Sequence, residues 1–151
     1  MALNPPGGGG SGLSRGSVVP DITGTTLEGE PFRLADLRGS PVIVNFWGPS
    51  CVPCRDEFPL FLSKLEQYEA DGLTIVGVLM HDPPGPASDF VREFGATWLT
   101  VDDPDGAIRK AYLAVARPTS YFVDREGILR SVQVGEVREA DFDRQYAAIA
   151  P

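Results

Sequence analysis

The stretch of sequence that decides the fold is residues 41–59, which read PVIVNFWGPSCVPCRDEFP. Its first seven residues form an apolar run that only Asn45 interrupts, the pattern of a central strand buried on both faces of a sheet. Residues 48–50 break the run, and apolar residues then recur with helical spacing at positions 58, 61, 62, 65 and 68. The stretch therefore predicts a buried strand followed directly by a helix over residues 51–70.

Two cysteines, Cys51 and Cys54, lie at this predicted junction with C-x-x-C spacing, and the chain has no others. A disulfide between them closes too short a loop to add much stability, so the pair indicates chemistry rather than a structural link. Exposed N–H groups and the helix dipole stabilise a thiolate at such a junction. The first sulfur can then attack a disulfide and the second can resolve it. Pro53 is expected to stiffen the first helical turn.

The rest of the chain continues the alternation of strands and helices. Segment 18–37 predicts a β-hairpin that ends in a short turn over 34–37. Further predicted strands span 73–79, 98–101, 119–123 and 128–134, and further predicted helices span 88–94, 105–113 and 138–149. Helices between successive strands place helical layers on both faces of one sheet. We therefore expect an α/β fold with a central mixed β-sheet flanked by helices.

Length and composition limit the possible functions. A chain of 151 residues fits one domain, which we expect at residues 18–151, and the Gly/Pro/Ser-rich residues 1–17 predict a disordered tail or linker. A net charge of −8 argues against a nucleic-acid partner. No stretch reaches the ~18 apolar residues of a membrane span. A zinc site needs about four ligands, and His81 is the only histidine, so we expect no metal site.

Residues 45–59 resemble the active-site segment of TlpA-like thioredoxin-fold proteins, which include the membrane-tethered thiol reductases of cytochrome c maturation. The Arg117-Pro118-Thr119 segment, which precedes a Tyr-Phe-Val-Asp strand, resembles the cis-proline loop of that family. The resemblance extends from about residue 18 to residue 149. It implies a thioredoxin-like fold with an added N-terminal β-hairpin, and a thiol:disulfide oxidoreductase in which Cys51 attacks and Cys54 releases.

The resemblance also assigns roles to residues around the cysteines. Glu57 shares a helix face with Cys54, and the matching acid in the reductases tunes the thiols or moves protons. Its alternative role is that of a first-turn acid that suits the helix dipole. Asn45 replaces the buried Asp of plain thioredoxin. Trp47 is expected to pack beneath the pair and to contribute to substrate binding, or else to be an ordinary core residue.

The same resemblance places Pro118 in cis with Arg117 facing the sulfurs. The backbone of Arg117 is then available to pair with an extended substrate strand. If the guanidinium of Arg117 points at Cys51, it lowers the pKa of that thiol; if it points to solvent, it is a surface charge only. Ser50 stands where the family commonly has an aromatic residue, which predicts a smaller and more polar rim. We also expect Pro53 to lie against the substrate.

The function implied by the resemblance is reduction of disulfides in protein partners, with an upstream electron donor and no cofactor. The expected location is the extracytoplasmic face of a bacterial cell membrane, with an anchor outside the given sequence, and the expected state is a monomer. One alternative is a disulfide-forming oxidant. Another is a copper-binding module that uses Cys51, Cys54 and His81. A peroxiredoxin is not supported, because Gly48 and Val44 stand where its Thr or Ser and its Pro are required.

Overall fold

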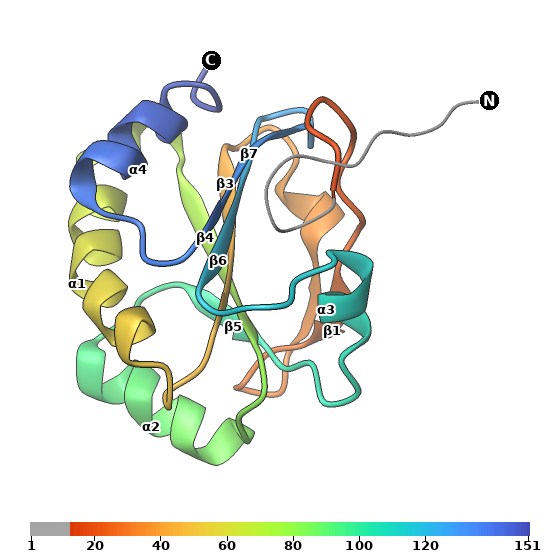
Figure 1. The fold of residues 1–151 in the computed structure, drawn as a ribbon, viewed down its shortest axis with the longest axis vertical. Helices are drawn as coiled ribbons and strands as arrows, with labels where there is room; N and C mark the ends of the chain where they lie inside the picture. Colours follow the sequence, from red (N-terminus) through yellow and green to blue (C-terminus); the bar gives the residue numbers. More distant parts are fainter. Residues whose placement is uncertain (1–12) are drawn as a thin grey trace.

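The computed structural model describes residues 13–151, and Figure 1 shows a sheet with helices on both faces. In chain order the elements are β1 (Thr23–Thr25), β2 (Pro31–Arg33), η1 (Leu34–Leu37), β3 (Val42–Trp47), α1 (Val52–Gln67), η2 (Glu69–Asp71), β4 (Thr74–Leu79), α2 (Pro84–Phe94), β5 (Leu99–Val101), α3 (Ala107–Ala111), β6 (Thr119–Val123), β7 (Leu129–Val134) and α4 (Glu139–Tyr146). The central sheet has the order β5-β4-β3-β6-β7, and β1 and β2 form a separate antiparallel pair. The predicted mixed sheet and N-terminal hairpin are confirmed.

Strand β3 lies at the centre of the sheet, and all six of its residues are buried. It pairs in parallel with β4 and antiparallel with β6. Its side chains alternate between two apolar cores, as the period of two in a strand requires. Ile43 and Trp47 belong to one core, and Val44 and Phe46 to the other. In Figure 1, α1, α2 and α4 lie on one side of the sheet, and α3 and the hairpin lie on the other.

Helix α1 continues through Pro59 and ends at Gln67, three residues before the predicted end. The 3-10 turn η2 follows it, and Gly72 then adopts a left-handed conformation with φ of 79°. Glycine enters this region without steric cost, which explains its position before β4. The buried face of α1 includes Phe58 and Phe61, as the helical spacing predicts.

Helix α2 begins at Pro84, four residues earlier than the predicted start at Ser88. The prediction assigned this proline-rich segment to a loop. Proline is tolerated in a first helical turn, because the N–H groups there have no intrahelical partner. Pro84 and Pro86 both lie in that turn. The predicted end is confirmed, since Gly95 is the left-handed residue that closes the helix.

Part of the predicted tail packs on the domain. The backbone N–H of Gly16 donates to the carbonyl of Leu129 at 2.8 Å, and the N–H of Leu129 donates to the carbonyl of Ser17 at 2.9 Å. Val18 forms a bridge to Ile128, next to these bonds. Gly16 and Ser17 are therefore connected to β7, and residues 1–12 of the predicted tail lie outside the described residues.

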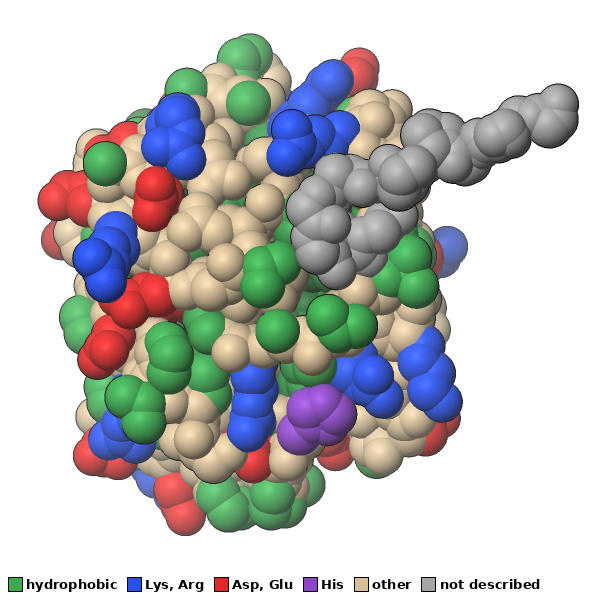
Figure 2. Space-filling model, viewed as in Figure 1, with side chains coloured by type: hydrophobic (Ala, Val, Ile, Leu, Met, Phe, Trp, Pro, Cys, Tyr) green, Lys and Arg blue, Asp and Glu red, His purple; other side chains and the backbone are tan. Residues whose placement is uncertain are grey.

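Charged side chains of both signs share the surface. Figure 2 shows Lys and Arg side chains as separate groups, with Asp and Glu side chains between several of them.

The core residue Trp47 leaves no room for a side chain at Gly77 on β4. A Cβ atom on Gly77 would lie 2.6 Å from both Trp47 Nε1 and Thr100 Oγ1, which are joined by a 3.1 Å hydrogen bond. We expect Gly77→Ala to lower the free energy of unfolding by about 1–3 kcal/mol, as overpacking of a core does. Urea denaturation measures this. Gly85→Ala is the control, because its Cβ meets nothing within 4 Å; equal losses in both variants would contradict the prediction.

Candidate active site

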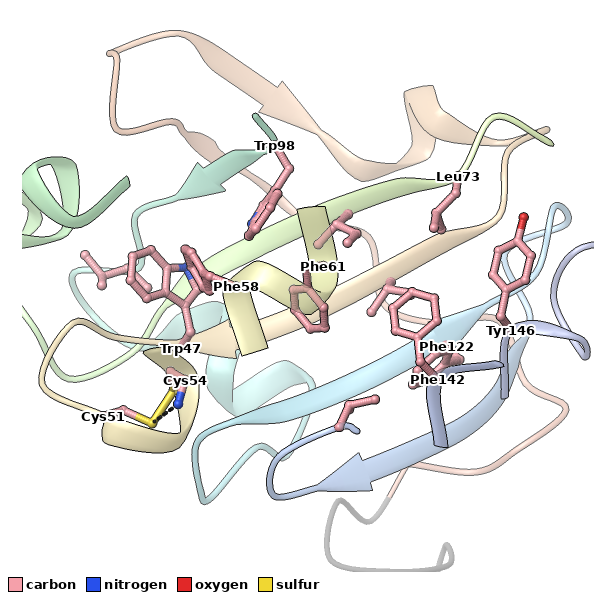
Figure 3. Packing of buried hydrophobic residues seen from close by; sticks show 14 of the residues in the cluster. Trp47, Cys51, Cys54, Phe58, Phe61, Leu73, Trp98, Phe122, Phe142 and Tyr146 are labelled. Atoms are coloured by element: carbon pink, nitrogen blue, oxygen red, sulfur yellow. Dashed lines mark hydrogen bonds between the residues drawn. A yellow bond between two sulfur atoms is a disulfide. The ribbon is translucent and has the colours of Figure 1, made fainter. Parts of the chain in front are cut away.

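Cys51 and Cys54 form a disulfide at the junction of β3 and α1, with their Cα atoms 5.3 Å apart. Cys51 is the N-cap residue of α1, and its Sγ accepts a hydrogen bond of 3.3 Å from the backbone N–H of Cys54 (Figure 3). Cys51 keeps 7% of its surface exposed, whereas Cys54 is fully buried. Pro53 and its neighbour Val52 are exposed beside the disulfide. Cys51 is therefore the sulfur that a partner reaches first.

Glu57 is fully buried in α1, one helical turn after Cys54. Its carboxylate accepts a hydrogen bond of 3.2 Å from Asn45 Nδ2 and one of 2.7 Å from the backbone N–H of Val137. Burial raises the pKa of Glu57 to about 8, against the lowering effect of these two hydrogen bonds. The alternative of a first-turn acid that serves the helix dipole does not fit these contacts.

Asn45 and Glu57 thus form a buried polar cluster in the core near the disulfide. Asn45 Nδ2 also donates to Ser120 Oγ at 3.0 Å, which links β3 to β6. Asn45 and Glu57 were identified from the sequence, whereas Ser120 and the backbone of Val137 were not. These partners lie 75 and 80 residues away from the groups that they contact, and no local pattern in the sequence indicates such pairs.

The Arg117-Pro118 peptide bond is cis, and Pro118 directly precedes β6. The guanidinium of Arg117 does not extend into solvent, since its side chain is 20% exposed. It donates to Asp82 Oδ2 at 2.9 Å and to the carbonyl of Met80 through Nη1, and to Ser50 Oγ at 2.6 Å through Nη2. Arg117 therefore forms an ion pair with Asp82, and its guanidinium contacts Ser50, the residue before Cys51.

Asp82, Ser50 and Arg117 form a cluster of hydrogen bonds that joins three loops. The carboxylate of Asp82 accepts hydrogen bonds of 2.9 Å from both the backbone N–H and the hydroxyl of Ser50. Ser50 precedes the disulfide, Asp82 follows β4, and Arg117 precedes the cis proline. Ser50 thus takes part in polar contacts beside the disulfide. Asp82 was not identified from the sequence, because it lies in a segment whose composition indicated only a loop.

Trp47 is fully buried and packs in the core near the disulfide (Figure 3). Its ring centroid lies 4.9 Å from that of Phe58, and its Nε1 donates to Thr100. A side chain with no exposed surface cannot contact a substrate. The expected substrate contact at Trp47 is therefore wrong, and Trp47 belongs to the same core cluster as Cys51 and Cys54.

The copper alternative requires His81 beside Cys51 and Cys54. His81 follows β4 in a left-handed conformation with φ of 67°, on an exposed loop. Among residues 13–151, no group of three or more His, Cys, Asp or Glu side chains is arranged to hold a metal ion.

Comparisons with known proteins agree with this geometry. The AhpC/TSA family model matches residues 16–132. The chain is 32% identical over 136 residues to the thiol-disulfide oxidoreductase ResA of Geobacillus kaustophilus, covering 90% of this chain and 78% of that protein. A thiol:disulfide interchange protein of the thioredoxin family from Chlorobium tepidum matches with a TM-score of 0.82 and 27% identity, covering 92% of this chain and 99% of that one. A secreted Mycobacterium tuberculosis disulfide oxidoreductase homologous to E. coli DsbE matches with a TM-score of 0.75 and 27% identity, covering 84% and 95%.

Proposed function

Since the chain belongs to the AhpC/TSA family, we propose that it reduces disulfides in partner proteins through the Cys51–Cys54 pair. The chain is a thiol-disulfide oxidoreductase, as its ResA relatives are. The observation that carries the proposal is the unequal burial of the two sulfurs at a helix N-terminus. Cys51 is partly exposed, and Cys54 is enclosed behind it. This arrangement suits attack by the first sulfur and release by the second.

The proposed exchange runs in two steps. The Cys51 thiolate attacks one sulfur of a partner disulfide, so that a mixed disulfide forms and the partner's S–S bond breaks. The released partner thiolate takes a proton from water. Cys54, as a thiolate, then attacks Cys51 Sγ, which restores the Cys51–Cys54 disulfide and releases the partner's second thiol. Two electrons have passed to the partner, and an upstream dithiol donor returns the pair to its reduced form.

The loop before β6 supplies a place for the partner chain in this proposal. Arg117 Nη2 lies 2.6 Å from Ser50 Oγ, and Ser50 is adjacent to Cys51, so this loop lies beside the disulfide. A partner strand that pairs with the backbone at Arg117 would bring its own cystine to Cys51. Pro53 is exposed beside the disulfide and contacts the partner in the same arrangement.

We further propose an extracytoplasmic location, a monomeric state, and partners that include the apocytochromes of cytochrome c maturation. The secreted relative from Mycobacterium tuberculosis supports the location. Attachment to a membrane is part of the same proposal. Within residues 13–151, no helix combines the length and apolar character needed to cross a bilayer.

A redox titration against glutathione tests the reducing direction. We expect the disulfide to be more reducing than the glutathione pool, with a potential well below the roughly −120 mV of a strong oxidant such as DsbA. Quenched samples at fixed glutathione ratios are separated by mass to count reduced and oxidised protein. A potential near that of the strong oxidant would replace the reductase with the alternative of a disulfide-forming oxidant.

A further inference from the structure

The ion pair of Asp82 and Arg117 lies beside the residue that precedes Cys51. We propose that Asp82 is a positioning residue for disulfide exchange, which holds Arg117 and cancels its positive charge so that the Cys51–Cys54 disulfide stays reducing. This inference rests on the proposed function, and it names a group that tunes the reduction potential of the Cys51–Cys54 disulfide.

The charges of Arg117 and Asp82 are paired and largely shielded from bulk water. Arg117 Nη1 and Asp82 Oδ2 are 2.9 Å apart, and their side chains are only 20% and 12% exposed. Burial opposes ionisation of Asp82, but hydrogen bonds from Ser50 and the charge of Arg117 hold its pKa below the usual value. Asp82 therefore keeps its negative charge beside the guanidinium, and the positive and negative charges of the pair cancel.

The position of the Asp82–Arg117 ion pair is fixed relative to Cys51. Ser50 accepts from Arg117 and donates to Asp82, so both members of the pair contact the residue next to the disulfide. Gly48 lies against them, because a Cβ on Gly48 would overlap Arg117 Nη1 and Asp82 Oδ2. The guanidinium therefore has little room to move away from this corner of the site.

In the reduced protein, Cys51 carries a thiolate. An uncompensated guanidinium at this position would stabilise that thiolate. Stabilising the thiolate favours the dithiol over the disulfide, which raises the reduction potential and weakens the protein as a reductant. The carboxylate of Asp82 removes this effect, because it presents an equal negative charge at the same corner.

Other charged groups near the junction are the same in every variant compared below. Glu57 lies in the core behind Cys54. On α1, Arg55 packs over the rings of Phe90 and Phe94 on α2, and Asp56 is exposed. His81 precedes Asp82 on the same loop. Differences among the variants therefore report on the ion pair.

The experiment compares Asp82→Asn, Arg117→Gln and the double variant in the whole chain. We expect Asp82→Asn to lower the pKa of the Cys51 thiol by about one unit. The glutathione equilibrium should shift toward the dithiol by up to about tenfold, which equals about 30 mV. Arg117→Gln should shift both quantities in the opposite direction. The double variant should return to within about twofold of the unmodified protein. Iodoacetamide alkylation across pH and the glutathione titration measure the two quantities.

The opposite signs separate a charge effect from loosening of the loops, which would move both single variants the same way. Single variants that shift together, or that do not shift, would overturn the inference. If Asp82→Asn fails to fold, Arg117→Gln and Arg117→Lys decide: only Arg117→Gln should lower the potential. If the unmodified protein performs no exchange, the proposed function fails; if it does and the variants match it, only the inference fails.

Asp124→Asn is the matched control. Asp124 pairs with Arg130 at 2.8 Å and is 10% exposed, so the same charge is removed from a similar environment. It follows β6 at the end where Val123 pairs with Val42, away from Cys51. The Cys51 pKa and the potential should not change in this variant. A shift equal to that of Asp82→Asn would mean that net charge alone is responsible, which overturns the inference.

Discussion

Cys51→Ser is expected to abolish disulfide exchange, with a loss on the order of 10³-fold or more, to the rate of the reducing agent alone. The hydroxyl of serine is not ionised at neutral pH, so no nucleophile remains at the exposed position. The fold should survive, because Cys51 is the N-cap of α1 and serine is among the best N-cap residues. Insulin reduction followed by turbidity measures the rate, and circular dichroism checks the fold.

A second variant, Cys54→Ser, tests which of the two cysteines attacks the partner disulfide. It keeps the attacking sulfur and removes the releasing one, so it should accumulate a mixed disulfide when the reduced variant is given a peptide that contains a disulfide. Mass spectrometry should find this adduct on Cys54→Ser and not on Cys51→Ser. The opposite distribution of adducts would assign the attack to Cys54, against the burial of that residue. Normal exchange by Cys51→Ser would end the proposed mechanism.

Local patterns were enough to predict most of the fold. The apolar run of β3 and the helical spacing in α1 each concern neighbouring residues, and both elements form where they are expected. The start of α2 was not predictable in the same way, because its proline-rich first turn has the composition of a loop. Whether such a segment becomes helical depends on the apolar residues that follow it, such as Phe90, and on their burial against the sheet.

In the active site too, features within one segment could be predicted from the sequence, and contacts between segments could not. Spacing alone identified the cysteine pair and placed Glu57 on the face of Cys54. The direction of the Arg117 side chain could not be predicted, because its partner Asp82 lies 35 residues away. That ion pair exists only once β4 and β6 flank β3 and bring their loops to one end of the sheet. Chemistry within one segment was thus accessible from the sequence, and electrostatics between segments was not.

Glu57→Gln is expected to slow the release of a mixed disulfide by about 100-fold, the lower end of general acid–base effects. Cys54 must lose a proton before it can attack Cys51. Glu57 lies one turn further along α1, and its pKa of about 8 suits proton transfer near neutral pH. Rapid-quench measurement of release from a preformed Cys51 adduct tests this. Glu66→Gln, on the exposed end of α1, should release at the normal rate.

The same variant should lower the apparent pKa of thiol alkylation, because Glu57 carries, above its pKa of about 8, a negative charge that opposes a thiolate and that glutamine lacks. An unchanged alkylation curve, together with normal release, would leave Glu57 without a role in the chemistry. A lowered pKa with normal release would keep the electrostatic role and remove the proton-transfer role.

The oxidised protein offers a further check on Glu57, because it contains no thiols. The pKa of Glu57 is raised from 4.5 to about 8 in the folded state, so the folded protein binds this proton more tightly than the unfolded chain does. The free energy of unfolding should therefore fall as pH rises from about 4.5 to about 8. At about 1.4 kcal/mol per pKa unit, the fall is about 3–5 kcal/mol.

Glu57→Gln should remove that fall, because glutamine does not titrate. Carboxylates with lowered pKa values, such as Asp82, Asp124 and Asp143, act in a different window: their contribution is lost as pH drops below about 4. Urea denaturation of the oxidised protein across this range separates the two. If the unmodified protein keeps constant stability between pH 5 and about 8, Glu57 is ionised in the folded protein over this range, which would contradict the raised pKa of its carboxyl.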